Sequence, residues 1–242
     1  MMSKTEAIVL HSLKYGDGQL IVDMFTRCYG RVSFIVSLPR SSRSKMKKQF
    51  FQPLTLLNIE TDIRPQQQLQ KLGEVSFLCP LPSLLCEPSK LSISLFLSEF
   101  LYHALRDEQQ SEPLFDYVKS GIEWLDARTG SISNFHLVFL MRLSRFLGFY
   151  PNLDDYRLGC CFDLRQSIFT TQPPAHHDYL MPQEAEHICL LMRMDFSTMH
   201  LFQLSRIQRN RILEILLLYY RLHLPALPEL RSIAVLHELF NG

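Results

Sequence analysis

The sequence contains no apolar run long enough to cross a membrane. Its longest unbroken apolar stretch near the C-terminus spans Ile215 to Tyr220, whereas a membrane-spanning helix needs about 20 apolar residues. The N-terminus carries an acidic residue and lacks a long apolar stretch before a small-residue cleavage site, which argues against a secretory signal. We therefore expect a cytoplasmic protein without a membrane span.

Signatures of catalysis are also missing. The 9 glycines are dispersed, and none of them forms a glycine-rich phosphate loop, a Gly-x-Ser-x-Gly elbow or a His-Glu-x-x-His motif. The adjacent carboxylates Asp154 and Asp155 follow Pro151, a setting typical of solvated turn residues. Because no nucleophile, base and orienting group can be assembled, we expect no enzymatic activity.

The cysteines are scattered along the chain and do not indicate a disulfide framework. The 6 cysteines lie in a long chain without a secretion signal, so we expect reduced thiols. The best metal candidate combines Cys160 and Cys161 with His176 and His177, but structural zinc sites normally use C-x₂₋₄-C spacing. Neighbouring residues of a strand also point to opposite faces. Core or incidental thiols fit better, and we predict no metal and no cofactor.

Acidic residues are absent from one long segment. The net charge of the chain is only +1, yet no carboxylate lies between Asp23 and Glu60, and residues 1–80 carry a balance of +5 against −4 for residues 81–242. Within "SLPRSSRSKMKKQFFQPL", residues 37–54, five cations lie close together: Arg40, Arg43, Lys45, Lys47 and Lys48. Such charges must be solvated or neutralised. Both a solvated face and an anionic partner are compatible with the pattern.

The first 80 residues have the pattern of short strands. Val32, Phe34 and Val36 alternate with polar residues, as in a half-buried strand, and Tyr15-Gly16-Asp17-Gly18 predicts a turn. The segments predicted as strands are 6–13, 19–26, 31–38, 54–61 and 69–78. Without intervening helices, five such strands indicate a small barrel or sandwich.

The remainder has a helical period. A proline-punctuated connector, "CPLPSLLCEP", marks the predicted boundary, and Ser89 is positioned to cap the first helix. The predicted helices begin at Ser89, at Ser111 and within 133–149, and continue with 183–194, 198–223 and 231–240. Gly148 is placed to end the third, and residues 159–171 predict a small inserted hairpin. The fold class is therefore α+β, with a β-barrel-like domain over residues 1–80 and a helical domain over residues 81–242.

The basic segment suggests a phosphate-binding role. Lys and Arg side chains that neutralise phosphates release counterions, and five contacts would give a log–log salt slope of about −3.5 for single-stranded nucleic acid. The adjacent Phe50 and Phe51 could stack on bases, but aromatic residues that flank a strand are more often core. Both interpretations remain open from sequence.

An ordered set of short motifs resembles the N-terminal part of the RecO family of bacterial DNA repair proteins. These motifs are Ile8-Val9-Leu10, Tyr15-Gly16-Asp17, Phe25-Thr26, Gly30-Arg31, the basic segment from Arg40 to Lys48, and Gln52-Pro53. The similarity continues through "RLSRFLGFYPNLDDY" to "YYRLHLPALPELRSIAVLHELF", which is similar to family members of the Bacteroides group. It therefore covers essentially the whole chain.

The resemblance implies an OB-fold followed by a helical domain, and a recombination mediator without catalytic turnover. It implies binding of single- and double-stranded DNA, annealing of complementary strands, pairing with RecR, contact with the C-terminal tail of the single-stranded DNA-binding protein, and help in loading RecA. We expect DNA contacts from Lys14, Arg27, Arg31, Arg40, Arg43, Lys45, Lys47 and Lys48. The rim of a pocket for the acidic tail is expected to use Arg142, Arg145, Arg206 and Arg209.

One departure from the family concerns zinc. Many members carry a four-cysteine module in the helical half, but "YRLGCCFDLRQSIFTTQPPAHHDYL" lacks paired C-x-x-C motifs. It resembles the subgroup in which a Phe-Asp-Leu hairpin replaces the metal.

Two other functions remain open: a protein-interaction adaptor whose basic segment binds an acidic partner, and an RNA-directed OB-fold protein.

Overall fold

The computed structural model describes residues 2–38 and 48–239, with side chains up to Leu236. By its internal contacts the chain divides into two compact units. Unit 1 comprises Met1–Ala127 with Glu229–Gly242, and unit 2 comprises Arg128–Pro228. The boundary predicted near residue 80 stays a prediction. The first two long helices after that point belong to the same compact unit as the strands.

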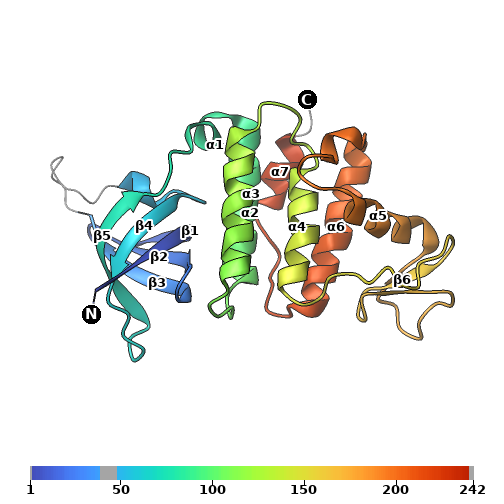
Figure 1. Ribbon diagram of the computed structural model, residues 1–242, viewed down its shortest axis with the longest axis horizontal. Coiled ribbons are helices and arrows are strands. Elements are labelled where there is room, and N and C mark those ends of the chain that lie inside the picture. Colours follow the sequence, from blue (N-terminus) through green and yellow to red (C-terminus); the bar gives the residue numbers. More distant parts are fainter. Residues whose placement is uncertain (1, 39–47, 240–242) are drawn as a thin grey trace. The chain divides into compact units, whose positions relative to one another are not determined.

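The N-terminal strands form a closed barrel in the order β1-β2-β3-β5-β4 (Figure 1). All neighbouring pairs are antiparallel except β3 and β5, which run parallel. The strands are β1 (Ser3–Tyr15), β2 (Gln19–Thr26), β3 (Gly30–Ser37), β4 (Leu56–Thr61) and β5 (Leu69–Phe77). The predicted strands are confirmed to within a few residues, and the barrel alternative is the one adopted.

Alternating side chains fill the barrel. Val22 and Met24 of β2 and Phe34 and Val36 of β3 lie in the core and are buried, and Val22 pairs directly with Phe34. One end of the barrel is closed by the 3₁₀ helix η1 (Lys48–Phe51), whose Phe50 and Phe51 keep only 9% and 2% of their surface. The core interpretation of these two rings is therefore confirmed, and they are not available as an exposed stacking platform.

Glycines allow the tight connections of the barrel. Gly16 and Gly18 adopt positive φ angles of 60° and 75° in the turn between β1 and β2, which confirms the predicted turn. Gly30 has φ +65°, and a Cβ atom there would lie 2.8 Å from the backbone of Glu108 and Gln109. Only glycine allows this close approach of two backbone segments.

Four helices complete unit 1: α1 (Pro82–Cys86), α2 (Pro88–Ala104), α3 (Glu112–Ala127) and α7 (Ile233–Leu239). Ser98 of α2 donates a hydrogen bond to the carbonyl of Leu10 in β1, and Glu99 accepts from the backbone N–H groups of Arg231 and Ser232. These bonds join α2 to the barrel and to the C-terminal segment. The predicted cap at Ser89 is wrong: α2 follows α1 directly, and the N-cap residue is Glu87.

Unit 2 contains three helices and a small sheet: α4 (Phe135–Phe146), α5 (Pro182–Arg193), α6 (Arg206–His223), β6 (Cys161–Asp163), β7 (Ile168–Thr170) and β8 (Tyr179–Leu180). The predicted hairpin is confirmed as β6 and β7, and β8 pairs with the other edge of β6. Gly148, with φ +85°, lies just beyond the end of α4, as predicted.

The long helix predicted over 198–223 is interrupted. A 3₁₀ turn, η2 (Met199–Leu201), is followed by a break, after which α6 begins with a capping box. The Ser205 side chain accepts from the N–H of Gln208, and the Gln208 side chain accepts from the N–H of Ser205. These reciprocal bonds satisfy N–H groups that a helix start leaves without partners, and so fix the start at this point.

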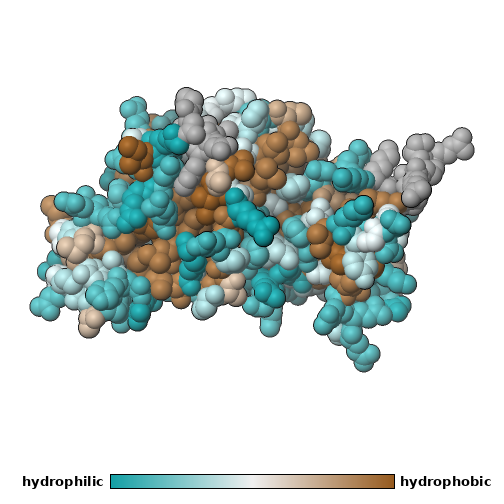
Figure 2. Space-filling model, turned by 180° about the vertical axis from the view of Figure 1, so that it is seen from behind, coloured by the Kyte–Doolittle hydropathy of each residue, from teal (hydrophilic) through white to brown (hydrophobic). Residues whose placement is uncertain are grey.

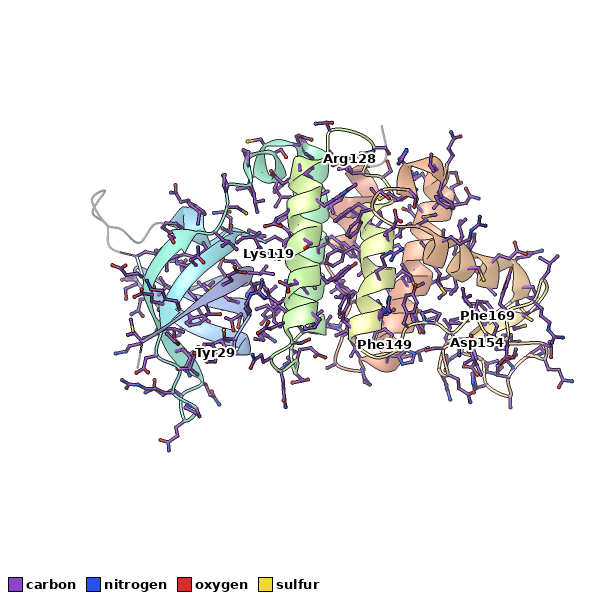
Figure 3. All side chains as sticks on the ribbon, viewed as in Figure 1. Tyr29, Lys119, Arg128, Phe149, Asp154 and Phe169 are labelled. Carbon is purple, nitrogen blue, oxygen red and sulfur yellow. The ribbon has the colours of Figure 1, made fainter. Side chains whose placement is uncertain are left out.

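Polar atoms inside unit 2 align its helices. Tyr220 donates to the carbonyl of Leu140 at 2.7 Å, and Tyr219 donates to Ser167 Oγ at 2.6 Å. Burial raises the pKa of Tyr219, so its hydroxyl stays protonated and keeps donating. Phe149, labelled in Figure 3, stacks on His223 with the ring centroids 4.6 Å apart.

In the described part of the chain, no helix is long and apolar enough to cross a membrane.

A buried lysine supports the start of the helical region and gives a first prediction. Lys90 is 2% exposed, and its ammonium donates to Ser83 Oγ and to the carbonyl of Asp126, both at 2.8 Å. We expect Lys90→Ala to lower the free energy of unfolding by about 1–3 kcal/mol, because buried acceptors lose their donor. Urea denaturation measures this, with the exposed Lys71→Ala as the control. Equal stability of the two variants would contradict the prediction.

Candidate nucleic-acid interface

Both ends of the basic segment lie beside the hairpin of β1 and β2. On the N-terminal side, the N–H of Leu38 donates to the carbonyl of Gly18 at 2.7 Å. On the C-terminal side, Ser12 Oγ donates to the carbonyl of Phe51 at 3.1 Å, at the end of η1. The predicted contacts Arg40, Arg43, Lys45 and Lys47 lie outside the described residues. Leu38 and η1, which flank the basic segment, therefore lie at the same end of the barrel.

Two predicted cations are exposed at this end. Lys14 lies in the part of β1 that pairs with β2 beyond the last residue paired with β4, and Lys48 is the first residue of η1. Because side chains of a strand alternate, Lys14 lies on the same face of β1 as Ser12, which contacts η1. Lys14 and Lys48 therefore flank the two ends of the basic segment.

The sequence analysis missed an apolar component of this surface. Leu13 is 55% exposed and Tyr15 is 51% exposed, on the strand face opposite Lys14. The end of β1 therefore exposes a cation on one face and an aromatic ring on the other, and exposed aromatic rings are a component of single-strand binding surfaces. The available signal was an aromatic residue at the edge of the Gly16–Gly18 turn, where no core is within reach.

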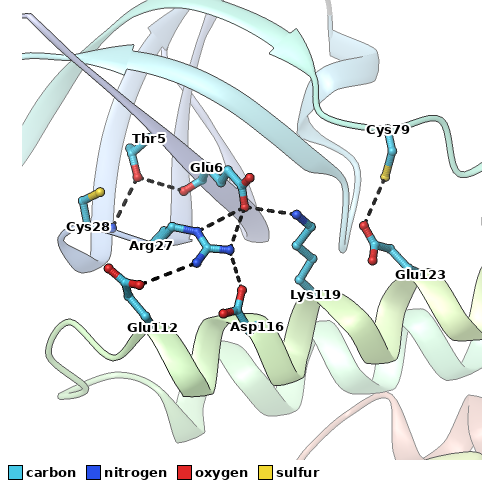
Figure 4. A network of polar contacts seen from close by, with 9 residues as sticks. All are labelled: Thr5, Glu6, Arg27, Cys28, Cys79, Glu112, Asp116, Lys119 and Glu123. Atoms are coloured by element: carbon cyan, nitrogen blue, oxygen red, sulfur yellow. Dashed lines mark hydrogen bonds and ion pairs between the residues drawn. The ribbon is translucent and has the colours of Figure 1, made fainter.

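Arg27 is engaged inside unit 1. Its guanidinium donates to Glu6 Oε2 at 3.2 and 3.1 Å and to Asp116 of α3, and it lies 3.9 Å from Glu112. Figure 4 shows this network, which Lys119 joins through Glu6 at 3.2 Å. Figure 3 shows Lys119 on α3. With three carboxylates around it, Arg27 joins the barrel to α3, a placement that does not favour the predicted contact with phosphate.

Arg31 also faces inward. Its side chain is 12% exposed and lies 3.5 Å from Asp23 Oδ1, with its guanidinium 4.4 Å from the ring centroid of Tyr102 in α2. A cation over an aromatic face is stabilised by the quadrupole of the ring. The structure thus places Arg31 between β3 and α2, while Lys14 and Lys48 point to solvent.

Asp23 is the carboxylate that holds Arg31 in this position. We call Asp23 and its partners His11, Arg31 and Ser33 the inner joint. Burial alone would raise the pKa of Asp23, but contacts from His11 and Ser33 and the charge of Arg31 outweigh it, and the pKa is held below its usual range. His11 Nδ1 lies 3.5 Å from Asp23 Oδ2, and Ser33 donates to Asp23 Oδ1. The carboxylate therefore remains charged at neutral pH and keeps Arg31 in place.

The cysteine and histidine residues weighed as metal ligands lie in unit 2. Cys160 and Cys161 are 3% and 4% exposed and contribute to its core. His176 Nε2 lies 3.3 Å from Asp163 Oδ2 of β6. Among the residues that the structure describes, no three His, Cys, Asp or Glu side chains gather closely enough to hold a metal ion.

The four arginines predicted to bind a partner occupy two places along α4 and α6. Arg142, which donates to the carbonyl of Met194 at 3.0 and 2.7 Å, and Arg145 lie on α4, whereas Arg206 and Arg209 lie in the first turn of α6. Their shared role as the rim of one pocket stays a prediction.

Two of these arginines are tied to the backbone and two are exposed. Arg209 donates to the carbonyl of Leu204, and burial lowers its pKa. Arg145 and Arg206 are exposed. Unit 2 also exposes large apolar side chains, Ile207 at 82% and Leu158 at 85% among them. Figure 2 shows apolar surface between hydrophilic side chains on one face of the chain.

The inner joint predicts a specific dependence of stability on pH. A carboxylate whose pKa is lowered by folding stabilises the native state above its unfolded pKa of about 3.9. This contribution is lost as the pH falls through the folded pKa. We therefore expect Asp23→Asn to be less stable than the parent at pH 5 to 7, and the difference to shrink as the pH falls towards 2. Urea denaturation at several pH values measures it, and a difference that stays constant over this range would contradict the assignment.

Comparison with known proteins gives two matches that together cover most of the chain. Residues 1–80 match the family model described as "Recombination protein O N terminal", and residues 87–232 match the one described as "Recombination protein O C terminal". A curated relative, "DNA repair protein RecO" of Phocaeicola vulgatus, is 52% identical over 241 residues, covering 100% of both chains. The proteins of the same name from Bacteroides fragilis and Christiangramia forsetii are 50% and 35% identical, again over 100% of both chains.

Proposed function

The chain belongs to the RecO family of DNA repair proteins, and from this premise we propose that it binds single- and double-stranded DNA and anneals complementary strands. The observation that carries the proposal is the basic segment, whose two ends lie beside the hairpin that presents Lys14. No carboxylate occurs from residue 24 to residue 59 to compete with phosphate for these cations.

Annealing follows physically from such a surface. Two complementary strands repel each other through their phosphates, and neutralising phosphates on both strands reduces that repulsion. Contacts to the backbone leave the base edges free to pair. The proposed activity needs no bond to be made or broken, so the protein acts as a binding protein and not as an enzyme.

We further propose the role of a recombination mediator. In this role the protein pairs with RecR, contacts the C-terminal tail of the single-stranded DNA-binding protein, and helps to load RecA at the nucleoid in the cytoplasm. Support comes from full-length similarity to curated DNA repair proteins. Exposed Arg145 and Arg206 in unit 2 provide cations for an acidic tail.

The first experiment is a fluorescence-anisotropy titration of a labelled single-stranded oligonucleotide with the full chain at several salt concentrations. We expect the logarithm of affinity to fall linearly with the logarithm of salt concentration. The variant with all of Arg40, Arg43, Lys45, Lys47 and Lys48 replaced by Ala should lose most of its affinity. Complementary oligonucleotides should anneal faster with the parent protein than with this variant. Absence of binding at low salt would overturn the proposal and favour an acidic protein partner for the segment.

A second experiment tests the contribution of Lys14 and Lys48, the two predicted cations that are exposed at the barrel end. We expect the double variant Lys14→Ala/Lys48→Ala to lower the salt slope by about 0.7 for each phosphate contact that is lost. The matched control is Lys4→Ala/Lys71→Ala, which removes the same charge. Lys71 lies near the start of β5, six residues and roughly 20 Å along the strand from Phe77, which contacts η1. Equal slopes for the two double variants would mean that non-specific charge alone attracts DNA.

A further inference from the structure

An apolar pocket lies where the chain leaves the barrel end closed by η1. Its volume is about 310 Å³. The walls come from η1 and the turn that follows it, from the end of β5, and from the connector into α1. The lining includes Gln49, Gln52, Phe77, Pro80, Pro82 and Leu85. All of these residues belong to unit 1.

The walls of the pocket include an exposed aromatic ring. Phe77 is the last residue of β5, and 43% of its surface is exposed. One side of the ring is supported by Phe50, with ring centroids 4.6 Å apart. Leu85 of α1 is 44% exposed. Exposed apolar side chains that gather around one cavity are typical of a ligand-binding surface.

The backbone around the pocket is held firmly. Leu54 adopts φ +59° although it is not glycine, and it is buried between two hydrogen bonds: its N–H donates to Val9 O at 2.8 Å, and the N–H of Val9 donates to Thr55 O at 3.0 Å. Such a conformation persists where its surroundings over-determine it. On the other side, Asp126 accepts from the N–H groups of Ser83 and Leu84 at 2.9 and 2.8 Å and fixes α1. The pocket is therefore pre-formed.

The polar groups that line the pocket are the amides of Gln49 and Gln52, the Thr55 hydroxyl and the Cys79 thiol, and the nearest charge along η1 is positive. Gln49 and Gln52 each carry a donor and an acceptor, and no carboxylate is among the lining residues. Lys48 precedes Gln49 directly in η1. Burial and the neighbouring Glu123 raise the pKa of the Cys79 thiol, which also lines the pocket, so the thiol stays protonated. The Glu123 carboxylate lies 3.8 Å from this thiol, on the side of the pocket away from Lys48 along the chain.

We propose that this pocket takes one unstacked base of single-stranded DNA, whose neighbouring phosphate is held by Lys48. The inference rests on the proposed DNA binding and adds to it a site for a base. A nucleobase presents a flat π face to Phe77 and a polar edge to the glutamine amides. The neighbouring phosphate then lies on the cationic side, where no carboxylate lines the pocket. A purely apolar side chain of a protein partner would use the ring but neither the amides nor the cation.

The test compares two single-stranded oligonucleotides of equal length, one with bases and one abasic throughout, so that both carry the same phosphates. The variant Phe77→Leu keeps an apolar side chain and removes the ring. We expect it to bind the base-containing strand about tenfold more weakly than the parent and to bind the abasic strand equally well. Phe146→Leu is the matched control, because Phe146 is 37% exposed in unit 2, and it should bind both strands as the parent does.

The outcomes separate the two levels of the proposal. If the parent binds neither strand, the proposed DNA binding fails. If the parent binds both, and Phe77→Leu matches it on both strands, only the base site fails, and an apolar side chain of a protein becomes the occupant. An equal loss on both strands would also overturn the base site, because backbone contacts would then explain the effect of Phe77.

A second measurement does not depend on the variant's folding. The parent protein is irradiated with an oligonucleotide that carries 5-iodouracil, which joins covalently to nearby aromatic side chains, and the linked peptide is identified by mass spectrometry. Linkage at Phe77 is the expected result. Linkage confined to Tyr15 or to unit 2 would place the bases elsewhere and overturn the inference.

Discussion

Closure of the five-stranded barrel is the constraint on which the rest of unit 1 depends. Because β3 and β5 pair in parallel and β4 lies between β1 and β5, the chain that leaves β3 cannot turn back into its neighbour. It must cross the end of the barrel before it enters β4. The crossover contains the basic segment and η1, and Phe50 and Phe51 fix its second half in the core. A core requirement thus positions a residue of opposite character, because Lys48 of the same η1 is exposed to solvent.

The same closure separates two kinds of cation that sequence alone treats alike. Arg27 and Arg31 lie where the barrel meets α3 and α2, and each meets carboxylates or an aromatic ring there. Guanidinium groups suit this setting because their planar donors match carboxylates and stack on rings. Lys14 and Lys48 lie at the barrel end, exposed to solvent. The two arginines therefore serve the cohesion of unit 1, and the proposed phosphate contacts are left to the lysines and the basic segment.

The helices of unit 1 give the barrel end its rigidity. Lys90 and Asp126 join α1 to α2 and α3 through hydrogen bonds, and Ser98 joins α2 to β1. These bonds hold the α1 wall of the pocket beside η1, and the hydrogen bonds between Val9 and the Leu54–Thr55 backbone hold the turn that follows η1, so a bound base would meet a pre-formed surface. Pre-organisation of this kind reduces the entropy that binding must offset.

The sequence by itself determined the local features of this protein. The alternation in "RVSFIVSL", the glycines of the first turn and the helical period after residue 80 are short-range patterns, and the strands and most helices followed them. The family resemblance also came from the sequence, because ordered motifs survive along the chain. Only the tertiary structure decided the parallel pairing of β3 with β5, the break before α6, the partners of Arg27 and Arg31, and the pocket at Phe77. The physical reason is that a side chain's charge and size are local properties, whereas its partners and exposure depend on segments distant in sequence that folding brings beside it.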